Sequence, residues 1–254
     1  MKIFEDFFEI GGPWEMLSRV GHILSGITWI GLLYFFNFVQ TPAYAELSDA
    51  ARSEALRKLT WRALWWFRWA AAATFVFGLL IIGVYGGETD TGESKMKLFF
   101  SGQHGVAILT GMLFGITMFL NVWGIIWRNQ KIVIGNAETV ASGGQANPDA
   151  PAAAKAGARA SRCNTLFSIP MLFFMVFAAH GGSWFGGGTK STIVYWILVL
   201  LLWAFIEASA LGLIGGIDSP FNQQAFNDHR RTIAAGFILL AVIYFIGWEL
   251  LLAP

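Results

Sequence analysis

The chain has 254 residues, of which 56% are hydrophobic, 16% aromatic and only 13% charged. Soluble domains carry about 25% charged residues, so this composition indicates a membrane protein. The formal net charge of +1 gives no reason to expect a nucleic-acid partner. The single cysteine, Cys163, excludes an internal disulfide, a cysteine-rich zinc site and the C-x-x-C-H attachment of a c-type haem.

Six stretches are long and apolar enough to cross a bilayer, which takes about 20 residues in a helix. The sequence therefore predicts an all-α integral membrane bundle of about six transmembrane helices in a single domain. In chain order, the predicted spans are about residues 18–40, 65–86, 98–127, 165–185, 192–215 and 232–252.

Two connections between these spans differ from ordinary loops. Residues 43–62 carry apolar residues at helical spacing together with alternating charges, which is typical of a helix lying in the membrane interface. Residues 135–160 are polar and rich in Ala, Gly and Pro. This composition predicts a flexible cytoplasmic loop.

Positive charge is concentrated in alternate connections. The first, third and fifth connections hold Arg52, Arg57, Lys58, Arg62, Lys131, Lys155, Arg159, Arg162, Arg230 and Arg231. Because cytoplasmic loops carry the excess of Lys and Arg, we expect these connections in the cytoplasm and both termini on the periplasmic side. The start of the sequence lacks the features of a cleavable signal peptide, and the predicted location is a bacterial inner (cytoplasmic) membrane.

Three of the four histidines fall at a similar depth in this arrangement. His22 lies near the outer end of the first predicted span, His104 near the outer end of the third and His180 near the outer end of the fourth. His229 lies on the inner side, beside Asp228. Ionisable side chains inside a membrane are rare and are functional hypotheses by default.

The residue types leave three interpretations open. Neutral imidazole is the commonest metal ligand, so the preferred hypothesis is that two of His22, His104 and His180 bind haem b from helices that face each other. The second is a copper or zinc site made by all three. The third is an accessory or assembly subunit of a larger respiratory or photosynthetic complex, in which the histidines are structural or contact a lipid or quinone. No catalytic residue is assigned.

Four stretches resemble a known family of membrane redox proteins. They read "HILSGITWIGLLYFFNFVQTPAY", "RALWWFRWAAAATFVFGLL", "GQHGVAILTGMLFGITMFLNVWGIIWRNQK" and "SRCNTLFSIPMLFFMVFAAH". Together, over roughly residues 15–185, they resemble the membrane domain of the cytochrome-linked urate hydroxylase family, also called the urate oxidase N-terminal domain.

The resemblance implies a membrane oxidoreductase that passes electrons to a c-type cytochrome, and it matches His22, His104 and His180 to histidines of the family. Family members typically carry a C-terminal cytochrome c domain, whereas this sequence stops at Pro254 without a C-x-x-C-H motif. Cys163 stands where a further family histidine is expected. The expected function is therefore a haem b protein that transfers electrons at the periplasmic side and acts with a separate cytochrome c partner, its substrate being urate or another compound.

Overall fold

The computed structural model describes residues 6–182 and 192–252. Within these residues, six helical runs are long and apolar enough to cross a membrane. The only β-type pairing in the described part is one isolated bridge between Glu88 and Ser94. The predicted all-α, multi-pass membrane bundle is therefore confirmed.

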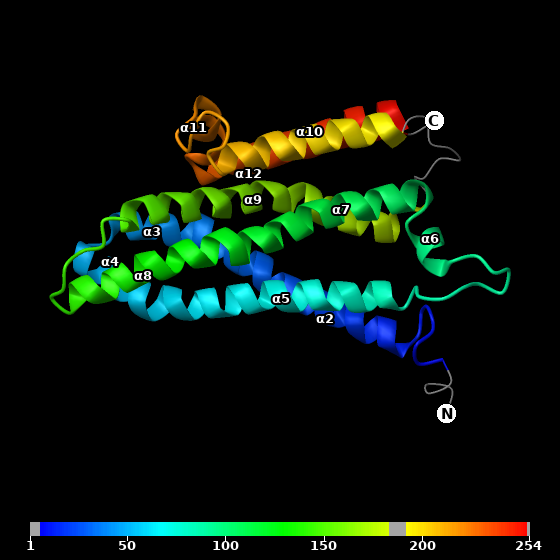
Figure 1. Ribbon diagram of the computed structural model, residues 1–254, viewed down its shortest axis with the longest axis horizontal. Helices are drawn as coiled ribbons and strands as arrows, with labels where there is room; N and C mark the ends of the chain where they lie inside the picture. Colours follow the sequence, from blue (N-terminus) through cyan, green and yellow to red (C-terminus); the bar gives the residue numbers. More distant parts are fainter. Residues whose placement is uncertain (1–5, 183–191, 253–254) are drawn as a thin grey trace.

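The first two spans form a hairpin, and each is interrupted by a short π-helical segment. The first span consists of α2 (Pro13–Tyr34), the π-helical η1 (Phe35–Gln40) and α3 (Thr41–Glu46). The second consists of α4 (Asp49–Ala55), the π-helical η2 (Leu56–Thr60) and α5 (Trp61–Gly83). Helices α2 and α5 pack along each other, as Figure 1 shows.

The remaining spans contain two further π-helical segments. The short α6 (Lys95–Phe99) precedes the third span, which consists of α7 (Gly102–Asn121), the π-helical η3 (Val122–Ile126) and α8 (Trp127–Ala141). The fourth span is the uninterrupted α9 (Ala150–His180) and the fifth is α10 (Thr192–Ala210). After the short α11 (Pro220–Phe226), the sixth span consists of α12 (His229–Ala241) and the π-helical η5 (Val242–Leu252).

Both unusual connections differ from their predictions in detail. The segment 43–62 is helical, but a non-helical step at Leu47 and Ser48 separates α3 from α4, and the Ser48 hydroxyl accepts a hydrogen bond from the Ala51 N–H to cap α4. The loop predicted over residues 135–160 is shorter than expected and covers residues 142–149, because α8 continues to Ala141 and α9 begins at Ala150. Alanine is the strongest helix former, so the Ala-rich sequence extends α9 beyond the bilayer-length apolar stretch.

Helix α9 lies at the centre of the bundle. It packs against α7, α8 and α12, with α2 and α5 on one side and α10 and α12 on the other (Figure 1). The rings of Phe114 in α7 and Phe167 in α9 are both fully buried, and their centroids lie 5.0 Å apart. By contrast, large apolar side chains such as Leu201 and Phe237 are exposed on the outer helices, as expected for surfaces that face lipid.

The two ends of the bundle carry different elements. Helix α6, the beginnings of α2 and α7 and the end of η5 lie at one end, and α3, α4 and α11 lie at the other (Figure 1). The start of α2 and the end of η5 therefore share one end, as six spans require. The side of the membrane to which this end belongs stays a prediction.

Candidate functional site

His22 lies in the tenth position of α2, facing α5. The half-buried ring places Nδ1 2.8 Å from the backbone carbonyl oxygen of Thr74. Gly78, one turn further along α5, leaves room for the imidazole: a Cβ at this position would lie 3.3 Å from the His22 Cε1 atom. A carbonyl oxygen only accepts hydrogen bonds, so Nδ1 carries the proton and the Nε2 lone pair is left available.

His104 has the same arrangement on a different helix. It is the third residue of α7, is half-buried, and its Nδ1 lies 2.8 Å from the carbonyl oxygen of Phe99 at the end of α6. The Phe99 ring packs edge to face against the imidazole at 5.0 Å. This ring is therefore also held as the Nδ1–H tautomer, which is the form that binds a metal through Nε2.

A buried carboxylate lies in the first turn of α2. Glu15 of α2 is 4% exposed, forms an ion pair with Arg19, and accepts hydrogen bonds from the Gly11 N–H at 2.7 Å and the Tyr85 hydroxyl at 3.2 Å. The Tyr85 ring stacks at 4.2 Å on Phe99, the residue whose carbonyl holds His104. Burial, followed by the nearby Glu15 charge, raises the pKa of Tyr85 above its usual value. The phenol is therefore a neutral donor that connects α2 to the His104 segment.

His180 is placed differently from the other two predicted ligands. It is the last residue of α9, at the same end of the bundle, and it is exposed. Among residues 6–182 and 192–252, no three His, Cys, Asp or Glu side chains are grouped so that they could hold a metal ion. The structure thus brings His22, His104 and His180 to one end of the bundle, the histidine end. In the described residues it does not join them in a three-ligand metal cluster. His229 lies beside Asp228 at 3.2 Å, in the α11–α12 connection at the other end.

Comparison with known protein families relates part of the chain to a described family. Residues 94–208 match the family described as urate oxidase N-terminal. This region of the chain is similar to the urate oxidase N-terminal family. Comparison with curated proteins and with solved structures gave no match.

The urate oxidase N-terminal region includes only part of the histidine end. His104 and His180 lie within the matched residues, and His22 lies before them. The matched region also contains Cys163, which the resemblance marked as a departure from a family histidine. The sequence alone did not indicate which side chains would surround this cysteine.

Cys163 belongs to a polar cluster inside the urate oxidase N-terminal region. Its thiol, fully buried, donates to the Glu207 carboxyl at 3.4 Å. The Asn121 side-chain amide donates to the same Glu207 oxygen at 3.2 Å and to the side-chain carbonyl of Asn164 at 3.0 Å. The Asn164 side-chain amide in turn donates to the backbone carbonyl of Met118 at 2.9 Å. The cluster joins α7, α9 and α10, and each of its four polar side chains finds a partner within it.

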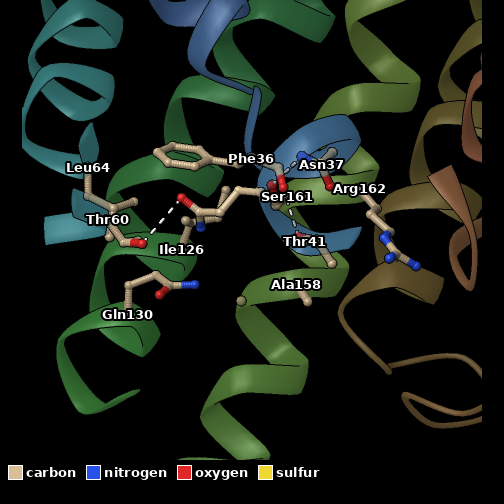
Figure 2. A pocket seen from close by; sticks show the side chains of 12 residues that line it. Phe36, Asn37, Thr41, Thr60, Leu64, Ile126, Gln130, Ala158, Ser161 and Arg162 are labelled. Atoms are coloured by element: carbon tan, nitrogen blue, oxygen red, sulfur yellow. Dashed lines mark hydrogen bonds between the residues drawn. The ribbon is translucent and has the colours of Figure 1, made fainter. Parts of the chain in front are cut away.

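A second polar site missed by sequence reasoning lies near the other end of the bundle. Figure 2 shows a cavity of ≈ 90 Å³, lined by Phe36, Asn37, Gln40, Thr41, Thr60, Leu64, Ile126, Gln130, Gly157, Ala158, Ser161 and Arg162. Of its polar side chains, Asn37 and Gln40 lie within the first predicted span, and the others lie outside the predicted spans. Only the three-dimensional packing of four spans brings them together.

Proposed function

We propose that the protein is a membrane haem b redox protein in which His22 and His104 are the first candidates for iron ligands. The observation that supports the proposal is the shared tautomer: each Nδ1 donates at 2.8 Å to a backbone carbonyl, which leaves the Nε2 lone pair of each ring able to bind a metal. When bound, haem b would supply one-electron chemistry. His180 is the third candidate, as a ligand or as a wall of the site.

The residues around these rings fit an iron macrocycle in their chemistry. Carbonyl partners on Nδ1 fix the ring orientation and raise the basicity of Nε2, as is common for metal-bound histidines. Phe99 supplies an aromatic face beside His104, and Arg19 supplies a cation for a propionate. An open apolar hollow of ≈ 460 Å³ lies at the same end, where Trp14 of α2 meets Leu79 and Val84 at the end of α5.

The proposed electron acceptor is a separate c-type cytochrome. With Cys163 as its single cysteine, this sequence has no C-x-x-C-H attachment for a c-type haem. We place the exchange of electrons at the histidine end of the bundle, facing the periplasm of a bacterial inner membrane. The resemblance to cytochrome-linked urate hydroxylases supports this choice of partner.

The test of haem binding is spectroscopic. The protein is purified in detergent, and its reduced-minus-oxidised spectrum and pyridine haemochrome are recorded for the wild type, His22→Ala, His104→Ala and His180→Ala. We expect a b-type α band in the wild type that is lost or strongly reduced in His104→Ala and His22→Ala. His229→Ala is the matched control, because His229 lies outside the histidine end and should leave the spectrum unchanged.

The same preparation separates the alternatives. A well-folded, colourless wild-type protein would contradict the haem proposal and favour an accessory or assembly subunit. Stoichiometric copper or zinc without haemochrome would instead favour a metal centre.

Urate is the proposed substrate class, because the family is described as urate oxidase N-terminal. The assay mixes the purified membrane protein with urate and oxidised cytochrome c, and follows the loss of urate in the ultraviolet together with cytochrome reduction. We expect both signals to depend on His104. Haem binding without urate loss would retain the redox proposal and reject urate as the substrate.

A further inference from the structure

Three of the π-helical segments converge on the cavity of Figure 2. Phe36, Asn37 and Gln40 belong to η1, Thr60 is the last residue of η2, and Ile126 is the last residue of η3. A π-helical segment strains regular hydrogen bonding and is found frequently at functional sites. Three of them from three different spans around one cavity indicate that this cavity has a role of its own.

A chain of hydrogen bonds from Tyr44 through Thr60 orients the amide of Gln40. The Thr60 hydroxyl donates to the Gln40 carbonyl oxygen at 3.2 Å, and the Tyr44 and Thr60 hydroxyl oxygens lie 2.9 Å apart. Because Thr60 has one proton and gives it to Gln40, Tyr44 must donate to Thr60. The Gln40 side-chain oxygen thereby accepts a hydrogen bond, and the Gln40 NH₂ group is left as a donor in the lining. Gln40 is largely buried, with 9% of its surface exposed.

Asn37 offers the opposite chemistry. Its NH₂ group donates both hydrogens, to the Leu33 carbonyl at 2.9 Å and to the Ser161 hydroxyl at 2.8 Å, as Figure 2 shows for Ser161. The Asn37 carbonyl oxygen therefore remains as an acceptor in a residue that is 5% exposed. The Ser161 hydroxyl, having accepted from Asn37, keeps its own proton to donate.

Apart from Arg162, the rest of the lining is neutral. Among the described residues that line the cavity there is no carboxylate, and Arg162 directs its guanidinium to the Phe226 carbonyl, away from the cluster of labelled amide and hydroxyl groups in Figure 2. Phe36, Leu64 and Ile126 supply apolar contacts. An occupant therefore meets donors and acceptors on an apolar surface, without a counter-charge.

We propose that this cavity binds the headgroup of a quinone or quinol. A neutral ring with carbonyl oxygens accepts from Gln40 and Gln130, and the hydroxyl of its reduced form donates to Asn37. The volume of ≈ 90 Å³ corresponds to about six to nine water-sized positions, the scale of one substituted ring.

Thr41 and Ala158, both exposed lining residues, mark an opening through which a lipid-soluble tail leaves. The lining residues belong to membrane-spanning runs, which favours a ligand that partitions into the bilayer. The proposal concerns binding alone and does not depend on haem at the other end.

The test measures binding of decylubiquinone to the purified protein by equilibrium dialysis in detergent. We expect saturable binding of one molecule per chain, weakened about 5-fold to 10-fold by Gln40→Leu and by Gln130→Leu, since each removes one hydrogen bond. The structure gives no protein hydrogen bond to the Gln130 side chain in the described part of the chain, so this variant should fold normally even if Gln40→Leu does not.

Gln223→Leu is the matched control. Gln223 is exposed, binds the Asp218 carbonyl and does not line the cavity, so the same substitution there should leave binding unchanged. Thymine, a soluble neutral ring that carries carbonyl acceptors and N–H donors, is the second probe. Saturable binding of thymine but not of the quinone, binding of neither, or quinone binding that survives both cavity variants would each overturn the assignment.

Discussion

Replacing Gly236 with alanine should destabilise the bundle at the crossing of α9 and α12. Pro170, inside α9, has no N–H to donate to the Leu166 carbonyl four residues earlier, and Gly236 of α12 packs against this carbonyl. A Cβ at position 236 would lie 2.9 Å from the Leu166 oxygen and 2.6 Å from the Ile169 Cδ1 atom. Ile169 has a flexible end, but the main-chain oxygen cannot rotate away, so α12 must move from α9.

The expected size follows from two opposing effects. Overpacking a close contact costs ~1–3 kcal/mol, whereas alanine is favoured over glycine within a helix by ~1 kcal/mol. Because one clash involves main chain, we expect a net loss of about 1–2 kcal/mol in the free energy of unfolding, or roughly 2–8 °C in Tm. The assay is thermal unfolding in detergent followed by helical circular dichroism.

Gly135→Ala is the control for Gly236→Ala. Gly135 lies in α8, is exposed, and would place its Cβ in open space, so this variant should gain up to ~1 kcal/mol from helix propensity alone. If Gly236→Ala were as stable as Gly135→Ala, the close approach of α12 to α9 described above would be refuted.

Three further predictions concern the core and one helix end. Asn164→Ala should cost about 2 kcal/mol or more, since it removes two buried hydrogen bonds and leaves Asn121 with one partner fewer; chemical unfolding in detergent measures this loss. Phe167→Ala should cost ~3–5 kcal/mol, and a double-mutant cycle with Phe114 should show ~0.5–1.5 kcal/mol of coupling for their ring contact; additive losses would contradict it. The Asp228 pKa is lowered chiefly by a backbone N–H at the start of α12, so its contribution to stability is present above the unfolded carboxyl pKa and is lost as pH falls through the folded pKa. Tm measured between pH 7 and pH 2 should decline less steeply in Asp228→Asn.

The sequence was sufficient to predict the six spans, because a bilayer sets a length and an apolar content that a single chain must meet. It was not sufficient to predict where each helix stops. The segment 135–160 looked like a loop from its Gly, Pro and polar residues, yet α9 extends to Ala150. Gly157 is buried against α8, where its Cβ would lie 3.4 Å from Asn129 Cβ, so tertiary packing supports helix in that region.

Depth along a span could be read from the sequence, but direction around the helix axis could not. His104 and His180 were expected at the same end, and α7 begins and α9 ends there. Their side chains nevertheless differ: His104 is held by a backbone carbonyl, whereas His180 is exposed. The cavity of Figure 2 could not be predicted from the sequence for the same reason, because its polar groups come from different spans and face one another only after folding.

Tyr44 does not line the cavity, yet it governs what the cavity can recognise. Its hydroxyl oxygen lies 2.9 Å from that of Thr60, and because Thr60 gives its own proton to Gln40, Tyr44 is the donor of this pair. Removing the phenol hydroxyl would free the Thr60 rotor, and the amide could then turn over and present an oxygen where it now presents hydrogens. Ligand preference at this site therefore depends in part on a residue outside the lining, because a change at Tyr44 removes a hydrogen-bond partner of Thr60 and leaves the lining residues in place.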